Sequence, residues 1–178
     1  MRRRNRYSLG LIVLLALASM VPATVAWGGA AVLGPVGFQS NGASISGWYW
    51  LRGSGHAATW TFDAAALQGA KKGSVYIDFN PLVTNGVNGG SGYQTTCKVT
   101  VEGTSAKTFS IPLTNPYRPV DPGDSGGVGY QCHGHSSTAL PASLYQGVGT
   151  IKVTISYPFP QRYHVAVNRD AMYMGYSK

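Results

Sequence analysis

The stretch that decides the fold is "TTCKVTVEG", residues Thr95–Gly103. Apolar and polar residues alternate in it one by one, Cys97, Val99 and Val101 against Lys98, Thr100 and Glu102. A period of two places the apolar side chains on one face of a β-strand and the polar side chains on the other. The stretch therefore predicts a strand with one buried face and one solvated face.

The same kind of signal recurs along the chain. Seven further stretches are short, rich in β-branched and aromatic residues, and separated by turns that contain Gly, Pro or Asn: residues 46–51, 57–62, 73–80, 107–113, 149–157, 163–168 and 171–176. Half-buried strands of this kind are typical of antiparallel sheets. The chain is therefore predicted to be an all-β, antiparallel two-sheet β-sandwich.

Helix signals are few. In "FDAAALQGA", residues Phe62–Ala70, Asp63 is placed to cap one short helical turn and Gly69 to end it. The stretch "PASLYQG", residues Pro141–Gly147, predicts a second short turn.

The first 26 residues have the layout of a secretory signal peptide. Four arginines precede an apolar run from Leu9 to Val21, and small residues at Thr24 and Ala26 form a cleavage site. The alternative is an uncleaved membrane anchor, although the run is shorter than the roughly 20 residues that span a bilayer. We expect a signal peptide (1–26), an N-terminal segment (27–43) and a single sandwich domain (44–178), secreted and without a membrane span in the mature chain.

Charge excludes one class of partner. The chain has 14 Lys and Arg against 6 Asp and Glu, and the signal peptide carries four of these arginines, which leaves 10 against 6 in the mature chain. The remaining cations are scattered, and only Lys71 and Lys72 are adjacent. Nucleic-acid binding needs a clustered basic stripe that neutralises phosphates, so we do not expect it.

The chain contains two cysteines, Cys97 and Cys132. Both follow the predicted signal peptide, so both would enter an oxidising compartment, where a pair of cysteines tends to form a bridge. We expect a disulfide, the alternative being a metal-binding or catalytic thiol.

Two segments add a family resemblance. They are "WTFDAAALQGAKKGSVYIDF" (Trp60–Phe79), a strand, short turn and strand, and the closing, hairpin-like "IKVTISYPFPQRYHVAVNRDAMYMGY" (Ile151–Tyr176). Their order resembles the galactose-binding-domain-like jelly roll of many carbohydrate-binding modules. The resemblance covers most of residues 44–176. It implies an eight-stranded jelly roll, often with a structural calcium, that binds sugars through loops or a concave face.

A second motif resembles the nucleophile sequence of trypsin-like serine proteases: Gly-Asp-Ser-Gly-Gly, residues 123–127. That chemistry needs a His and an Asp beside the Ser. His56 precedes Ser125, with Asp63 or Asp78 between them, but His56 lacks the family's sequence context and the chain is too short for two barrels. We interpret the motif as a turn, and we expect no enzyme activity.

Two groups of residues are candidate metal ligands. Asp121 and Asp124 lie three residues apart in a Gly-rich loop, where carboxylates and carbonyl oxygens suit a structural Ca²⁺. His133 and His135 would share one face of an extended segment and begin a Zn or Cu site, but they need a third ligand. The alternative readings are a solvated turn and an exposed pair of histidines.

Two long loops, residues 81–93 and 115–130, are the expected ligand site, because loops of this length are often functional. Aromatic and amide side chains in or beside them are the candidate contacts: Tyr93, Tyr117, Tyr130, Asn85, Asn88 and Asn115. Trp48 and Trp50 alternate with Tyr49, so one face of that strand is expected in the core and the other is a candidate aromatic surface for a sugar.

These observations favour a secreted, non-catalytic binding module that recognises carbohydrate or another cell-surface or matrix component. The first alternative is an extracellular structural or assembly protein. The second is a small hydrolase, which would need a pair of acids across a cleft. The oligomeric state is left open.

Overall fold

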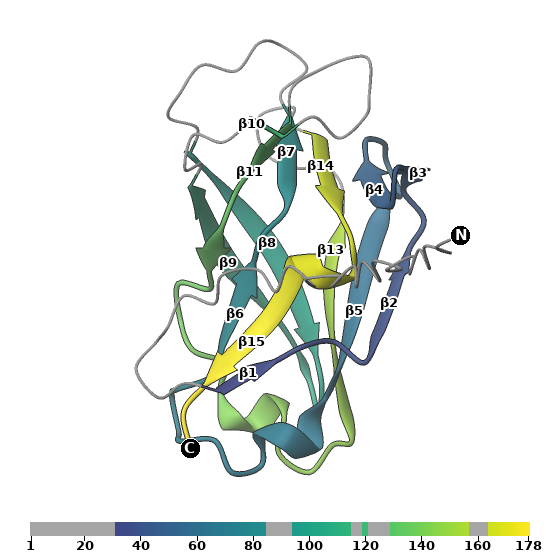
Figure 1. Ribbon diagram of the computed structural model, residues 1–178. Helices are drawn as coiled ribbons and strands as arrows, with labels where there is room; N and C mark the ends of the chain where they lie inside the picture. The colour runs from purple at the N-terminus through teal and green to yellow at the C-terminus, as the bar shows by residue number, and fades with distance from the viewer. Residues whose placement is uncertain (1–30, 85–93, 115–118, 121–128, 157–163) are drawn as a thin grey trace, which may run out of the picture.

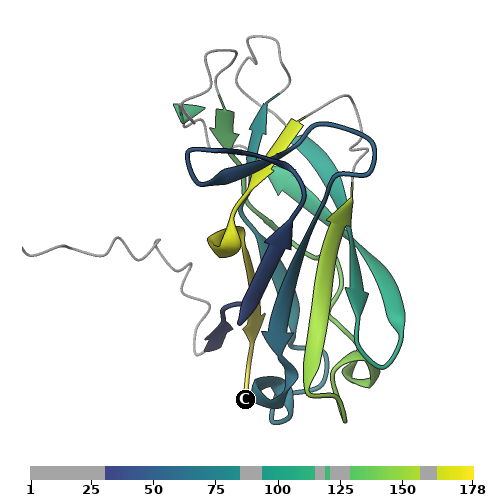
Figure 2. The same cartoon turned by 90° about the vertical axis from the view of Figure 1, so that its right-hand side faces the viewer.

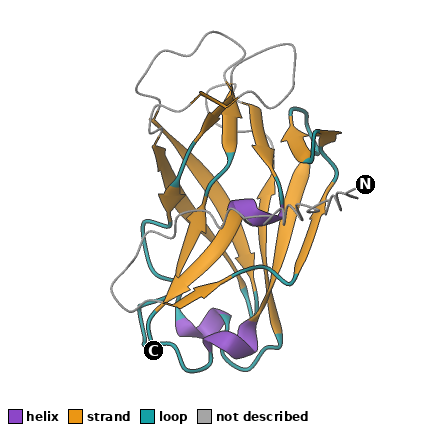
Figure 3. Cartoon of the chain, viewed as in Figure 1, coloured by secondary structure: helices purple, strands orange, loops and turns teal. Residues whose placement is uncertain are grey.

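The structure is a computed structural model that describes residues 31–84, 94–114, 119–120, 129–156 and 164–178. Among these residues strands predominate, with short 3-10 helices at three turns (Figure 3). The strands are β1 (Ala31–Leu33), β2 (Gly37–Ser40), β3 (Ala43–Ile45), β4 (Trp48–Leu51), β5 (Ala57–Asp63), β6 (Tyr76–Phe79), β7 (Leu82–Thr84), β8 (Gln94–Glu102), β9 (Ala106–Thr114), β10 (Pro119–Val120), β11 (Gly129–Gln131), β12 (Gly134–His135), β13 (Thr150–Ser156), β14 (His164–Val167) and β15 (Met172–Tyr176). The helices are η1 (Ala64–Leu67), η2 (Ala142–Leu144) and η4 (Arg169–Ala171).

The strands form three antiparallel sheets, in the orders β1-β15-β6-β12, β10-β11-β7-β14-β4-β3 and β2-β5-β13-β8-β9. The first two sheets share one layer, because β6 leads into β7, β11 into β12 and β14 into β15 after breaks of two to four residues (Figure 1). The five-stranded sheet forms the other layer. Figure 2 shows the two layers side by side, with the yellow β14 and β15 in one and the yellow-green β13 in the other. The predicted all-β antiparallel sandwich is confirmed.

The core lies between the two layers and is built by the alternation seen in the sequence. In β8, Val99 and Val101 are buried while Lys98 and Glu102 are exposed, as the opening stretch predicts. One contact across the layers joins Trp60 of β5 to Phe79 of β6, whose rings meet edge to face with centroids 6.0 Å apart. All eight predicted strands are present, as β4, β5, β6, β8, β9, β13, β14 and β15.

Local sequence signals also set the short helices. The Asp63 side chain accepts a hydrogen bond of 2.9 Å from the backbone N–H of Ala65, which caps η1 as predicted. The helix ends with Gln68 as its C-cap, one residue before Gly69. The predicted turn after Pro141 is η2.

The strands differ from the sequence prediction in three places. Residues 82–84, 119–120 and 129–131, expected in or next to the two long loops, form β7, β10 and β11, which are too short for a period of two to be recognised. Residues 31–43, expected to precede the domain, supply β1, which pairs with β15, and β2, which pairs with β5. The closing segment is not a hairpin, because β13 pairs with β5 and β8 while β14 pairs with β4 and β7 in the other layer. The strands β1 and β2 are short and contain or adjoin glycine, so their sequence pattern is too weak to predict the strands with which they pair.

The structure does not contain the predicted disulfide between Cys97 and Cys132. Cys97 faces Ile111 across the β8–β9 ladder, whereas His133, next to Cys132, bridges Thr114 on the other side of β9. Cys97 thus belongs to the five-stranded sheet, whereas Cys132 lies in the connection between β11 and β12 in the other layer, and no disulfide joins them across the core. Burial raises the pKa of each thiol to about 12.

The predicted signal peptide lies outside the described residues and stays a prediction. Across the ranges that are described, the chain forms no helix of the length and apolarity that a bilayer crossing requires.

Candidate functional site

Most of the loop residues chosen from the sequence lie outside the described residues. This holds for the ligand candidates Tyr93, Tyr117, Asn85, Asn88 and Asn115 and for the calcium candidates Asp121 and Asp124. Tyr130 is placed in β11, where its backbone pairs with Val83 of β7, but its side chain is not described. Among the described residues, the candidate binding surfaces are therefore the outer faces of the sheets.

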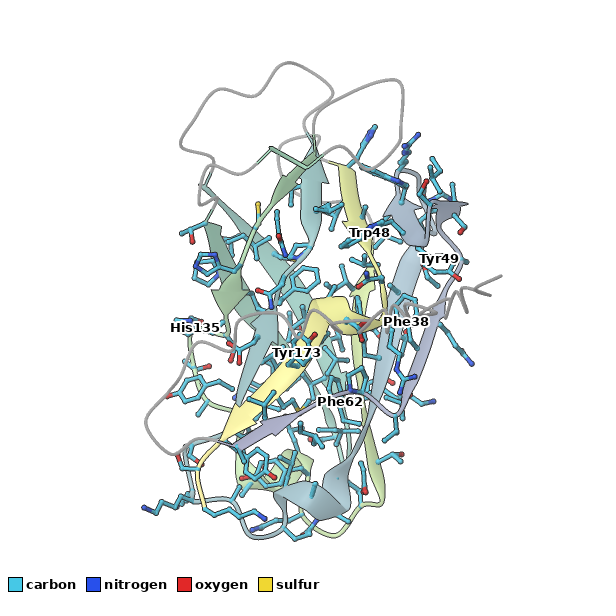
Figure 4. All side chains as sticks on the ribbon, in the orientation of Figure 1. Phe38, Trp48, Tyr49, Phe62, His135 and Tyr173 are labelled. Atoms are coloured by element: carbon cyan, nitrogen blue, oxygen red, sulfur yellow. The ribbon has the colours of Figure 1, made fainter. Side chains whose placement is uncertain are left out.

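The outer face of the four-stranded sheet carries one continuous polar row. Tyr173 of β15, Asp78 of β6 and His135 of β12 are direct cross-strand partners, so their side chains point to the same side. Figure 4 labels Tyr173 and His135, which lie on the strands either side of β6. Because side chains alternate along a strand, Asp78 lies on the opposite face of β6 from the buried Ile77 and Phe79.

The next cross-strand row on this face has a glycine, Gly175, at its centre. Gly175 of β15 lies between Val32 of β1 and Tyr76 of β6, its direct partners. Val32 is 54% exposed and Tyr76 is 37% exposed, which makes them two of the most exposed large apolar side chains among the described residues. Backbone without a side chain is therefore accessible between an aliphatic and an aromatic group.

The two rows meet at Asp78. A Cβ atom added to Gly175 would lie 3.1 Å from Asp78 Oδ2, so the carboxylate leans over the glycine. The Tyr76 ring packs edge to face against the His135 ring, with centroids 6.3 Å apart. We call this set the Gly175 site: Val32, Tyr76, Asp78, His135, Tyr173 and Gly175.

Electrostatics at the Gly175 site are dominated by one carboxylate. The four strands of this sheet contain no Lys or Arg, and Asp78 is their single Asp or Glu. Burial raises the pKa of Asp78, and the nearby His135 partly offsets the effect. Burial also raises the pKa of Tyr173, with a further contribution from Asp170 of η4. The site thus presents a carboxylate that is costly to ionise and has little compensating positive charge.

A second cluster, which contains two tryptophans, lies on the outer face of the six-stranded sheet. Trp50, Leu82 and Ala166 form a buried cross-strand row there, apart from the main core, with Trp48 packed against it. Trp50 is only 1% exposed, and the Arg52 guanidinium carbon lies 4.7 Å from its ring centroid. Trp50 therefore packs against its neighbours and offers no open ring face. Within the described part of the chain, its buried Nε1 has no hydrogen-bond partner.

Tyr49, on the other side of the same strand, packs towards the main core, with its ring centroid 5.4 Å from that of Phe38. The sequence expectation that one face of this strand is core is confirmed. The candidate sugar-stacking surface on its opposite face is not formed by Trp50.

The described residues that a protease triad would need do not come together around His56. His56 Nδ1 accepts a hydrogen bond of 3.2 Å from the backbone N–H of Arg52, which closes a local turn. Asp63 lies at the far end of β5, about 23 Å away at roughly 3.3 Å per strand residue, and it caps η1. Asp78 pairs with His135 in register, and Ser125 lies outside the described residues. A His–Asp pair built on His56 is therefore not assembled.

His133 and His135 lie beside different strands. The backbone of His133 bonds Thr114 of β9 in both directions, at 2.9 and 3.1 Å, whereas His135 belongs to β12 beside Asp78. Among the residues that the structure describes, no group of three or more His, Cys, Asp or Glu side chains is arranged to hold a metal ion. A zinc or copper site at this pair is not supported.

Comparison with protein-family models, with curated proteins and with solved structures found no match to this chain. The resemblance to galactose-binding jelly rolls accordingly stays a hypothesis. Residue alternation placed Tyr76 and Asp78 on one outward face, but it gave no means of finding Val32, Tyr173 and Gly175 beside them. Only the pairing of β1, β15 and β6 brings these residues together.

Proposed function

We propose that this chain is a secreted, non-catalytic module that binds carbohydrate, and that the Gly175 site is its binding surface. The observation that carries the proposal is the exposed Tyr76 ring next to a half-buried carboxylate, Asp78, around the bare backbone of Gly175. The proposal keeps the class of function expected from the sequence and moves the site from the loops to a sheet face.

The chemistry of the site suits a sugar. A sugar ring has apolar C–H faces and a rim of hydroxyl groups, so it needs an aromatic or aliphatic surface and hydrogen-bonding groups side by side. Tyr76 and Val32 supply the first, and a carboxylate such as Asp78 accepts hydrogen bonds that are stronger than those of neutral acceptors. All of these groups stand on paired strands, so little conformational entropy is lost when they are ordered by a ligand.

Binding is favoured over hydrolysis because Asp78 has the wrong neighbours for a glycosidase. Its in-register partners are His135 and Tyr173, and the four described strands of the sheet hold no second carboxylate. Glycoside hydrolysis by the usual route needs two acids across the scissile bond.

The test is a glycan array with the chain expressed from residue 27, followed by calorimetry on each saccharide retained. Tyr76→Ala is expected to weaken binding at least tenfold, and Tyr76→Phe is expected to retain most of it, because the ring supplies the contact. Saccharide binding by Asp78→Asn is compared with binding by the control Glu102→Gln, which removes an exposed acid from the other layer. The array and the calorimetry are both run with and without calcium, because Asp121 and Asp124 are the candidate calcium ligands. Absence of saccharide binding in all conditions, or equal binding by Tyr76→Ala, overturns the proposal.

A further inference from the structure

We propose that the Gly175 site selects saccharides that carry a protonated amine, so that its ligand is an amino sugar with a free amino group. This inference rests on the proposed function, because it names the class of sugar that the same site would take. It is carried by the placement of one carboxylate, two tyrosines and a bare glycine on a sheet face that has no Lys or Arg on its strands.

The geometry gives a small cation direct access to Asp78. Because Oδ2 lies 3.1 Å from the position of a Cβ atom on Gly175, a group that rests on the glycine backbone is in contact with the carboxylate oxygen. An ammonium group is small and donates three hydrogen bonds, so it can bond this oxygen while the rest of the sugar covers Tyr76. Any side chain at position 175 would obstruct that approach.

Tyrosine rings near Asp78, one on β15 and one on its own strand, add to the attraction. Tyr173 is the direct partner of Asp78, and Tyr76 is two residues before Asp78 on the same face of β6. A cation near the face of a tyrosine ring is attracted by its π electrons, and the effect grows when water is displaced. Tyrosines beside a carboxylate therefore suit an ammonium group better than they suit a neutral hydroxyl.

Three elements carry the groups near Asp78. His135 faces it from β12, and the uncharged Tyr173 faces it from β15. On η4, Asp170 acts on Tyr173, and the adjacent Arg169 donates its guanidinium hydrogen bond to the Pro35 carbonyl. A ligand ammonium would compensate a carboxylate that burial makes costly to ionise. Because burial raises the pKa of Asp78, binding of an amino sugar is expected to weaken as the pH falls and the carboxylate takes up a proton.

The experiment compares a β-1,4-linked glucosamine hexamer with its fully N-acetylated counterpart by calorimetry at pH 7. The two hexamers differ both in charge and in their acetyl groups. Titrations at low and at high salt separate the electrostatic part of the difference in affinity, because salt screens interactions between charges. We expect the free-amine hexamer to bind at least tenfold more tightly, with a preference that shrinks at high salt. Asp78→Asn is expected to reduce the preference to less than about twofold, whereas Glu102→Gln leaves it unchanged.

Three results would overturn the inference. Equal or tighter binding of the acetylated hexamer refutes the selection for an amine, while the proposed carbohydrate function survives. A preference that persists in Asp78→Asn refutes the role of the carboxylate. Binding of polylysine as tight as that of the free-amine hexamer reassigns the site to protein amines. If neither hexamer nor any arrayed glycan binds, the proposed function itself fails.

Discussion

Gly175→Ala is the most informative single substitution, because it adds one methyl group at the centre of the Gly175 site. Gly175 does not have a positive φ, so alanine is compatible with its backbone. The new Cβ would lie 3.1 Å from Asp78 Oδ2, a few tenths of an ångström closer than an ordinary contact. The half-buried carboxylate can move by that amount at small cost, and replacing glycine with alanine restricts the unfolded chain, which stabilises by about 0.4–1 kcal/mol.

We therefore expect the free energy of unfolding to change by less than about 1 kcal/mol. Saccharide binding should weaken at least tenfold, or about 1.4 kcal/mol, because the methyl group occupies the backbone surface and displaces the carboxylate. Urea denaturation and calorimetry with the saccharide retained on the array measure the two effects. Gly69→Ala is the matched control, since a Cβ there meets no atom within 4 Å. Unchanged binding by a stably folded Gly175→Ala would show that ligands bind elsewhere, and a loss of several kcal/mol of stability would refute the geometry of the sheet face.

Three further predictions concern stability and reactivity. Asp78→Asn should unfold at a higher temperature than the wild type at pH 7. The pKa of Asp78 is raised in the folded chain, so the folded chain binds the carboxyl proton more tightly than the unfolded chain does. Asp78 therefore stabilises the fold fully only below its pKa in the unfolded chain. This stabilisation is lost as the pH rises through the pKa of Asp78 in the folded chain. The difference in melting temperature should therefore vanish near pH 3, and a less stable variant at pH 7 would contradict this reasoning. Cys97 and Cys132, with pKa values of about 12, should resist a thiol reagent in the native protein and react, two per chain, in guanidinium; two unreactive cysteines after denaturation would indicate a disulfide. Trp60→Phe should cost about 2–4 kcal/mol in urea denaturation, because it opens a cavity and leaves the carbonyls of Asn168 and Arg169 without the 3.1 Å bonds from Nε1. A cost below about 1 kcal/mol would mean that Trp60 is not the link between β5 and η4.

Much of the fold was readable because strand signals are local. The strands β8, β9 and β13 are seven to nine residues long, and in each of them three apolar residues stand two positions apart. This pattern identifies the buried face of each strand without knowledge of its partner. The cap at Asp63 is equally local, since donor and acceptor are two residues apart. Short strands such as β2 and β12 have too few residues for a period to be recognised, and they became visible only through their pairing.

The candidate site shows the opposite case. The sequence predicted a site of aromatic and amide residues in long loops, whereas the described site consists of strand residues that carry no distinctive sequence pattern. Tyr76 and Tyr173 are separated by 97 positions, and nothing in either stretch indicates that they share a sheet face. The disulfide expectation failed for the same kind of reason, because the number of cysteines and the compartment do not indicate in which layer of the sandwich each cysteine lies.

The sequence by itself determined that this chain forms antiparallel strands with one buried face each, since side-chain period and turn residues act over a few positions. The tertiary structure alone decided which strands are neighbours, and hence that Val32, Gly175 and Tyr76 form one row beside Asp78. Strand order depends on how several apolar faces pack at once and on the entropy of closing long loops, which are properties of the whole chain.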